Sequence, residues 1–101
     1  MIERKSARMM KIKLEDTIGL MCAEDYRDRL KAEYLQLVIR LRDLMAYWNR
    51  MEDRLSPQGS YILEQLGAMK AYRSVLRKRL YIEGLFPDSL DAVCELDKKE
   101  E

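Results

Sequence analysis

The fold of this protein is decided by residues 26–55, which read YRDRLKAEYLQLVIRLRDLMAYWNRMEDRL. Eight apolar or aromatic side chains recur there at alternating intervals of four and three residues: Leu30, Tyr34, Leu37, Leu41, Leu44, Trp48, Met51 and Leu55. This spacing places all eight along one stripe of a helix, as in the seam of a coiled coil. The sequence therefore predicts one long helix over residues 24–55.

The same helix is expected to carry a second apolar stripe beside the first, formed by Leu35, Val38, Ile39 and Met45. A helix that packs against a single partner needs only one such stripe. The second stripe is therefore a contact surface, either for another part of the chain or for another molecule. One hypothesis takes it as an exposed interface with a protein partner.

The segment after the long helix, Ser56-Pro57-Gln58-Gly59-Ser60, is the clearest break in the chain. Proline ends one helix or opens the next, glycine gives the backbone freedom, and either serine can cap a helix. A second helix is expected over residues 60–82, and the short connection makes the two helices antiparallel neighbours. Residues 87–101 are expected to form a short helix with an acidic tail, and residues 1–22 an N-terminal arm with a short helix.

These elements predict a single all-α domain over residues 1–101, built around a long antiparallel helical hairpin. At 1.5 Å per residue the first helix is about 48 Å long and the second about 34 Å, which leaves an overhang of about 14 Å. Either the two ends of the chain or a second chain must cover the overhang. Because a two-helix hairpin of this size is marginally stable alone, we expect a homo-oligomer.

Composition argues against several classes of function. The chain has no histidine, and its two cysteines, Cys22 and Cys94, are far apart in sequence, so we expect no metal site and no disulfide framework. Without histidine the commonest general base is missing, and we expect a protein that is not an enzyme and has no cofactor. There is no apolar run of about 18 residues that would predict a membrane span, and the expected location is the cytoplasm.

Charge is distributed unevenly along the chain, although its total is only +1. The net charge is +4 over residues 1–13, −4 over 14–25, +2 over 26–55, +4 over 56–82 and −5 over 83–101. Segments of opposite sign are expected to pair with each other. In the expected hairpin, Arg73 and Arg77 face residues 37–44 of the long helix, close to Arg40 and Arg42.

This group of arginines has two interpretations. Like charges across a helix contact are unfavourable unless an anion lies between them, and arginine beside tyrosine is typical of a phosphate or nucleotide site. Such a site would bind phosphate through its arginines and a base or ribose through its tyrosines, and its residues would be Arg40, Arg42, Arg73, Arg77, Tyr34 and Tyr72. In the other interpretation, the arginines are solvated or paired with Glu33, Asp43 or the acidic C-terminal segment.

Residues 13–18 read KLEDTI and residues 25–34 read DYRDRLKAEY. The second helix has Gln65, Ala68-Met69, Tyr72 and Arg79, and it is followed by Glu83-Gly84. Over about residues 13–84 this pattern resembles a family of small uncharacterised proteins of phages and prophages of gut bacteria, labelled as related to a crAss-like phage product. The resemblance implies a phage context and no established activity.

In a phage context, small helical oligomers of this size often counter host defence. The leading hypothesis is a phage- or prophage-encoded, non-enzymatic protein that sequesters a nucleotide-type immune second messenger, either a cyclic nucleotide or an ADP-ribose derivative. The alternatives are a helical module that inhibits or adapts a host defence protein, and a structural coiled-coil phage protein. The expected partners are a second copy of the chain and one of these ligands, in the cytoplasm of the bacterial host; specific nucleic-acid binding and membrane binding are not expected.

Overall fold

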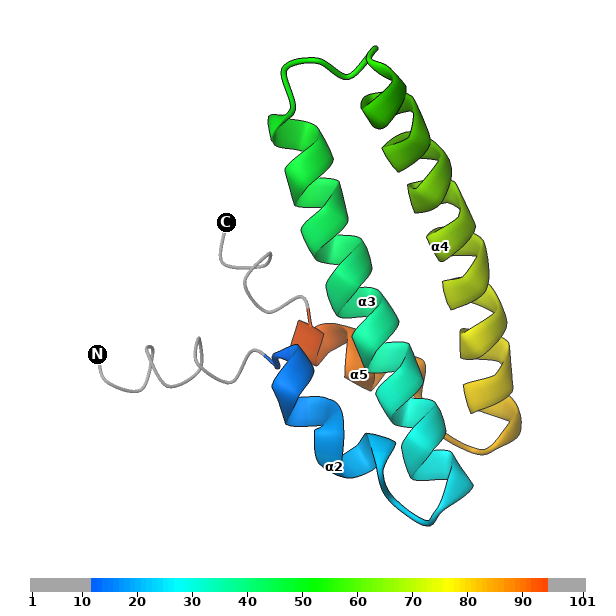
Figure 1. Ribbon diagram of the computed structural model, residues 1–101. Helices are drawn as coiled ribbons and strands as arrows, with labels where there is room; N and C mark the ends of the chain where they lie inside the picture. The colour runs from blue at the N-terminus through cyan, green and yellow to red at the C-terminus, as the bar shows by residue number, and fades with distance from the viewer. Residues whose placement is uncertain (1–11, 95–101) are drawn as a thin grey trace.

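The computed structural model describes residues 12–94, which are mostly helical and contain no strand, as the sequence predicts. In chain order the elements are the 3₁₀ helix η1 (Leu14–Thr17) and the α-helices α2 (Ile18–Met21), α3 (Tyr26–Arg50), α4 (Pro57–Ile82) and α5 (Pro87–Cys94). Helices α3 and α4 form a long antiparallel hairpin, with α2 and α5 packed beside α3 (Figure 1). None of the helices within residues 12–94 is long and apolar enough to cross a membrane.

Both long helices begin at a side-chain cap. The carboxylate of Asp25 accepts a hydrogen bond of 2.9 Å from the backbone N–H of Arg27. The hydroxyl of Ser56 accepts one of 3.1 Å from the backbone N–H of Gly59, and Pro57 occupies the first turn of α4. These bonds satisfy N–H groups of the first turn that have no partner within the helix. Helix α4 therefore starts at Pro57, three residues before the predicted position.

Helix α3 ends at Arg50, earlier than the heptad pattern predicts. The side chain of Arg54 folds back and donates hydrogen bonds of 3.0 Å and 2.5 Å to the backbone carbonyls of Trp48 and Asn49. These carbonyls lie in the last turn of α3, where partners within the helix run out, although the Trp48 carbonyl also accepts a 3.2 Å hydrogen bond from the N–H of Met51. Leu55, which the pattern places in the apolar seam, is 97% exposed.

The early end of α3 changes which residues meet across the hairpin. Trp48 Nε1 donates a 3.3 Å hydrogen bond to the carbonyl of Gly59, and Arg73 Nε donates one of 3.3 Å to the hydroxyl of Tyr34. The register inferred from the sequence placed Arg73 opposite residues 37–44. That register is wrong by about two helical turns, because residues 51–56 form the connection and not part of α3.

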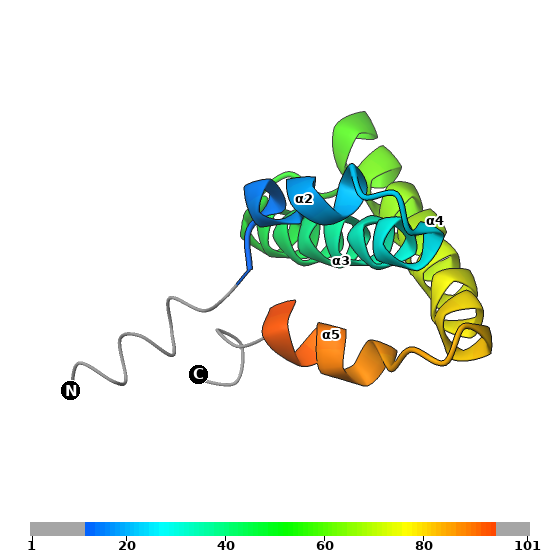
Figure 2. The ribbon, with the colours of Figure 1, turned by 90° about the horizontal axis from the view of Figure 1, so that it is seen from below.

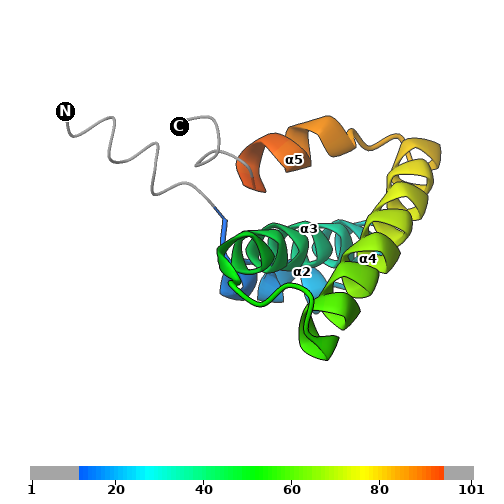
Figure 3. The ribbon, with the colours of Figure 1, turned by 90° about the horizontal axis from the view of Figure 1, so that it is seen from above.

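The chain itself covers the part of α3 that the hairpin leaves open. Helix α2 lies on one side of α3 and α5 on another (Figures 2 and 3). Leu30 and Tyr34, at the N-terminal end of α3, are therefore almost completely buried. On the α2 side, Gln36 Nε2 donates a 2.8 Å hydrogen bond to the hydroxyl of Thr17, which is also buried.

The second apolar stripe of α3 is part of the core. Leu35, Val38 and Ile39 are 3% exposed or less and belong to the cluster that also contains Leu76 and Leu80 of α4. The hypothesis of an exposed protein interface on these three residues is therefore wrong for this fold. The fourth residue of the stripe, Met45, is partly buried and packs against a second cluster formed by Leu41, Ile62 and Leu66.

A glycine turn returns the chain from α4 towards α3. Gly84 has a positive φ of 79°, a conformation that side-chain-bearing residues rarely adopt. The N–H of Gly84 bonds to the carbonyl of Tyr81 at 3.0 Å, and that of Leu85 to the carbonyl of Leu80 at 2.9 Å. This is the hydrogen-bond pattern of a Schellman motif. It brings α5, with its acidic side chains, over the arginines of α4.

Candidate functional site

Asp91 of α5 is the centre of an ionic cluster that joins α3, α4 and α5. One carboxylate oxygen, Oδ1, accepts a hydrogen bond of 2.5 Å from the Tyr34 hydroxyl. The other, Oδ2, accepts from Arg73 Nη2 at 2.8 Å and from Arg77 Nη1 at 2.5 Å. Arg77 Nη2 also donates to Asp88 Oδ1 at 2.6 Å. The expectation that arginines pair with the acidic C-terminal segment is thus confirmed for Arg73 and Arg77.

The electrostatics of this cluster keep its arginines charged and its tyrosine neutral. The pKa of Arg77 is raised, first by its hydrogen bond to Asp88 and then by that to Tyr34. Burial raises the pKa of Tyr34 above the ordinary 10.0, and the hydrogen bond to Asp91 adds to the effect. The cluster therefore holds two guanidinium groups against two carboxylates. A phosphate ligand would have to displace α5 to bind there.

Arg42 lies outside the Asp91 cluster and contacts the C-terminal end of α5. Its Nη1 donates a 2.7 Å hydrogen bond to the carbonyl of Cys94, at the C-terminal end of α5. Its Nε and Nη2 both contact Asp43 at 3.1 Å. A cation at this position satisfies a terminal carbonyl and favours the negative end of the helix dipole. Arg42 thus fastens α5 and is not brought together with Arg40.

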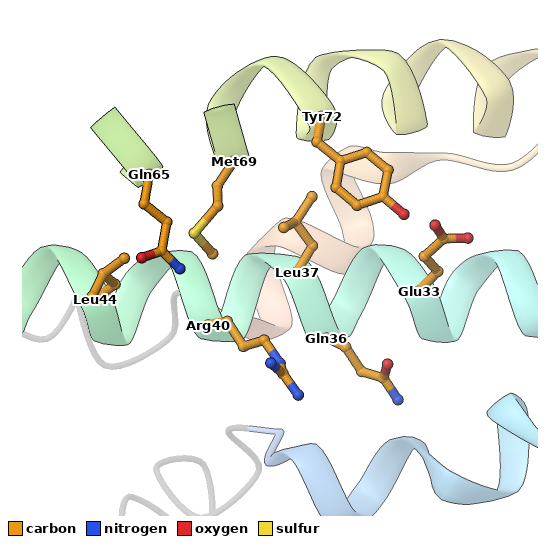
Figure 4. A pocket seen from close by; sticks show the side chains of 8 residues that line it. All are labelled: Glu33, Gln36, Leu37, Arg40, Leu44, Gln65, Met69 and Tyr72. Atoms are coloured by element: carbon orange, nitrogen blue, oxygen red, sulfur yellow. The ribbon is translucent and has the colours of Figure 1, made fainter. Parts of the chain in front are cut away.

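An open groove of about 410 Å³ lies along α3 and α4 and is lined by side chains of these two helices (Figure 4). In the figure α3 crosses the middle, α4 lies above it and α2 below. Leu37, Leu44 and Met69 supply apolar surface. The polar lining consists of one carboxylate, two carboxamides, one guanidinium and one phenol, which belong to Glu33, Gln36, Gln65, Arg40 and Tyr72.

Arg40 and Tyr72 are the two predicted site residues that line the groove, although their side chains extend on different sides of α3. Tyr72 projects from α4 towards Glu33 of α3, whereas Arg40 points with Gln36 towards the α2 side (Figure 4). Arg40 is exposed and, within residues 12–94, its side chain has no hydrogen-bond or ion-pair partner. It therefore differs from Arg42, Arg73 and Arg77, whose guanidinium groups are all bonded to protein oxygens.

Six groove residues were not singled out as site residues from the sequence: Glu33, Gln36, Leu37, Leu44, Gln65 and Met69. A signal for those on α3 was present, since positions 33, 36, 37, 40 and 44 fall on one helical face, and Leu37 and Leu44 among them belong to the apolar seam. For those on α4 there was no equivalent signal. Which face of α4 meets Arg40 depends on the register of the hairpin, and the sequence pattern implied the wrong register.

Residues 24–82 match the family model described as Sequestin. The match covers more than half of the chain, both long helices and every residue that lines the groove, and it stops before α5. No curated protein and no solved structure is significantly similar to the chain. On the basis of the family match, this chain belongs to the Sequestin family.

Proposed function

We propose that the protein is a non-enzymatic sequestering protein, encoded by a phage or prophage, that binds a nucleotide-type immune second messenger in the groove between α3 and α4. The ligand is a cyclic nucleotide or an ADP-ribose derivative, and it is held without being converted. The name of the family points to sequestration. The matched residues 24–82 include the whole groove but neither Asp88 nor Asp91 of the ionic cluster.

The unpaired guanidinium of Arg40 in the groove is the observation that carries this proposal. A phosphate is recognised by charge-assisted hydrogen bonds from a cation whose donors are not already used by a protein carboxylate. Among the four arginines considered for this role, Arg40 alone meets that condition within residues 12–94. We therefore propose that the phosphate binds at Arg40, on the side of α3 that faces α2.

The rest of the groove suits a base and a ribose. Tyr72 offers an aromatic face on which a base can stack, and Leu37 and Met69 lie beside it. The Glu33 carboxylate can accept hydrogen bonds from ribose hydroxyls, and the Gln65 amide can both donate to and accept from a base edge. The volume of about 410 Å³ lies within the range of about 300–1,000 Å³ that is common for small-molecule sites.

The proposal is tested by isothermal titration calorimetry with a panel of cyclic dinucleotides, cyclic ADP-ribose isomers and ADP-ribose. We expect at least one ligand to bind, and Arg40→Ala to weaken its binding about 10- to 100-fold, because hydrogen bonds to charged groups contribute about 1.5–3 kcal/mol. Arg50→Ala is the matched control, since Arg50 is an exposed arginine of the same helix that does not line this groove. Its affinity should equal that of the unmodified protein.

The fate of the ligand separates sequestration from turnover. After incubation, heat denaturation should release the bound nucleotide unchanged, as chromatography against the starting compound will show. A panel without any binding ligand contradicts the proposal, and so does recovery of a converted product. Equal losses of affinity in Arg40→Ala and Arg50→Ala would mean that only general positive charge matters, and would remove the groove as the site.

A further inference from the structure

Helix α4 has an apolar side that nothing within residues 12–94 covers. It packs on α3 along one side only, and its opposite side forms an edge of the molecule (Figures 2 and 3). Six large apolar or aromatic side chains of α4 are between 43% and 82% exposed: Tyr61, Leu63, Tyr72, Val75, Tyr81 and Ile82. Val75 and Ile82 lie near the middle of this side, Tyr61 and Tyr72 on one flank and Leu63 and Tyr81 on the other, with the polar residues Glu64, Ser74 and Lys78 between them. So many exposed apolar side chains on one side of a helix are typical of a contact site.

The centre of this side consists of small residues, with residues of opposite charge at equal distances before and after it. Gly67, Ala68 and Ala71 are all exposed and have little or no side chain, so another backbone can approach closely there. Glu64 lies two helical turns before Ala71 and Lys78 two turns after it, on the same side of the helix. Within residues 12–94 neither Glu64 nor Lys78 has an ion-pair partner.

We propose that this side of α4 binds the same side of a second copy, in a twofold-symmetric homodimer whose α4 helices run antiparallel and cross at Ala71. A twofold interface uses the same patch on both copies, so every pair in it occurs twice. Glu64 of each copy then lies opposite Lys78 of the other, which satisfies four charges with two ion pairs. A parallel arrangement would instead place Glu64 against Glu64, at a cost from like-charge repulsion.

The size of the side chains agrees with the same arrangement. Val75, which is 51% exposed, falls four residues after Ala71 on the outer side of the helix. In an antiparallel pair centred on Ala71 it packs against Gly67 and Ala68 of the partner copy, so that a large residue meets small ones. Such alternation of large and small residues lets two helices approach to about 8–10 Å between their axes.

The area available indicates a reversible dimer. Residues 60–82 of α4 are about 34 Å long, and a contact strip about 10 Å wide along them covers roughly 340 Å² of each copy, or roughly 700 Å² over both copies. This is smaller than a standard specific interface, so the population of dimer should depend strongly on protein concentration. The proposed dimer does not depend on nucleotide binding, because dimerisation is measured without any ligand. Tyr72 nevertheless borders both the groove and this surface.

Sedimentation velocity of the full chain over a wide range of concentrations tests the dimer. We expect a monomer–dimer equilibrium, and no detectable dimer for Ala71→Arg, which places two bulky cations at the twofold axis. Arginine is a good helix former, so this variant should keep its fold, as circular dichroism will verify. Ala46→Arg is the control for an exposed helical alanine elsewhere, and it should dimerise normally.

A charge exchange tests the antiparallel orientation. Glu64→Lys and Lys78→Glu should each weaken the dimer about tenfold, because each creates two like-charge contacts, and the double variant should restore it. A chain that stays monomeric at all concentrations overturns the proposal. So does a dimer that Ala71→Arg leaves intact, or a double variant that is no better than the single ones. Binding of a different protein to this surface of a strictly monomeric chain would also overturn it.

Discussion

The hydroxyl of Tyr34 donates a hydrogen bond of 2.5 Å to Asp91, a residue 57 positions further along the chain. Tyr34 is completely buried in α3, and Asp91 belongs to the short helix α5. Because Arg73 and Arg77 of α4 bond to the same carboxylate, one side chain connects three helices. Two arginines that look like a phosphate site in the sequence are thereby used to hold the C-terminal helix in place.

Tyr34→Phe should change how stability depends on pH. The pKa of Tyr34 is raised above 10.0 in the folded protein, so the fold favours the neutral phenol. That stabilisation is fully present below the unfolded pKa and is lost as the pH rises through the folded pKa. Near neutral pH the variant should be less stable by about 1.5 kcal/mol, because a hydrogen bond to a charged group is lost.

Above pH 10 the difference between the two proteins should become smaller, since only the unmodified protein must bury a phenolate. Urea unfolding at neutral and alkaline pH measures both differences. Tyr81→Phe is the control for removal of an exposed tyrosine hydroxyl, because Tyr81 is 51% exposed. A difference that stays constant or grows with pH would show that Tyr34 is not held as a neutral donor.

Asp91→Asn should destabilise the protein much more than Asp88→Asn. The side chain of Asp91 is only 15% exposed and neutralises two partly buried arginines, so removal of its charge should cost about 2–4 kcal/mol. Asp88 pairs with Arg77 alone and is 77% exposed, which limits its contribution to less than about 1 kcal/mol. Thermal unfolding of both variants compares the two sites directly, and equal effects would contradict a central role for Asp91.

Gly59→Ala should be destabilising for a steric reason. A Cβ atom at Gly59 would collide with the backbone of Arg54, including its carbonyl oxygen, so the backbone between α3 and α4 would have to shift. We expect a loss of about 1–3 kcal/mol, as for other overpacked positions. At Gly19 a Cβ would meet nothing within 4 Å, so Gly19→Ala should be neutral or slightly stabilising. Similar melting temperatures for the two variants would argue against this close approach.

Arg54→Ala should loosen the end of α3 and alter the environment of Trp48. The guanidinium carbon of Arg54 lies 4.9 Å from the centre of the Trp48 ring, and its N–H groups cap two carbonyls of the helix. Loss of these contacts should cost about 1 kcal/mol and shift the fluorescence of the single tryptophan to longer wavelength. Arg54→Lys should lie between the two, because lysine keeps the charge but not the planar fork. Unchanged emission would show that the contact does not persist in solution.

Much of the fold follows from local patterns. The repeat from Leu30 to Trp48 lies on α3, Ser56 and Pro57 mark the start of α4, and Gly84 lies at the turn after it. The same pattern misleads beyond Arg50. Met51 and Leu55 continue the heptad spacing, but α3 ends at Arg50, where the side chain of Arg54 folds back onto the last turn. Periodicity records the intervals between apolar residues and contains no information about a side chain that folds back onto the backbone.

For the candidate site the sequence identifies the right kinds of residue but not their partners. Arg40 and Tyr72 line one groove, as a combined arginine–tyrosine site requires, whereas Arg73, Arg77 and Tyr34 meet the carboxylates of α5. The alternation of charge along the chain already indicates that basic and acidic segments pair. It does not indicate that Asp91 lies against Tyr34 or that Arg40 has no acidic partner within residues 12–94.

By itself, the sequence determined that this chain forms helices, that a break near Ser56-Pro57 separates the two longest and that these run antiparallel, because helical periodicity, turn residues and short connections act over a few residues. Only the tertiary structure decided which arginines are neutralised and which one remains available in a groove. That outcome depends on the residue at which α3 ends and on the path of α5 after Gly84. A change of one helical turn in either would bring different side chains together, so contacts across helices cannot be derived from local patterns alone.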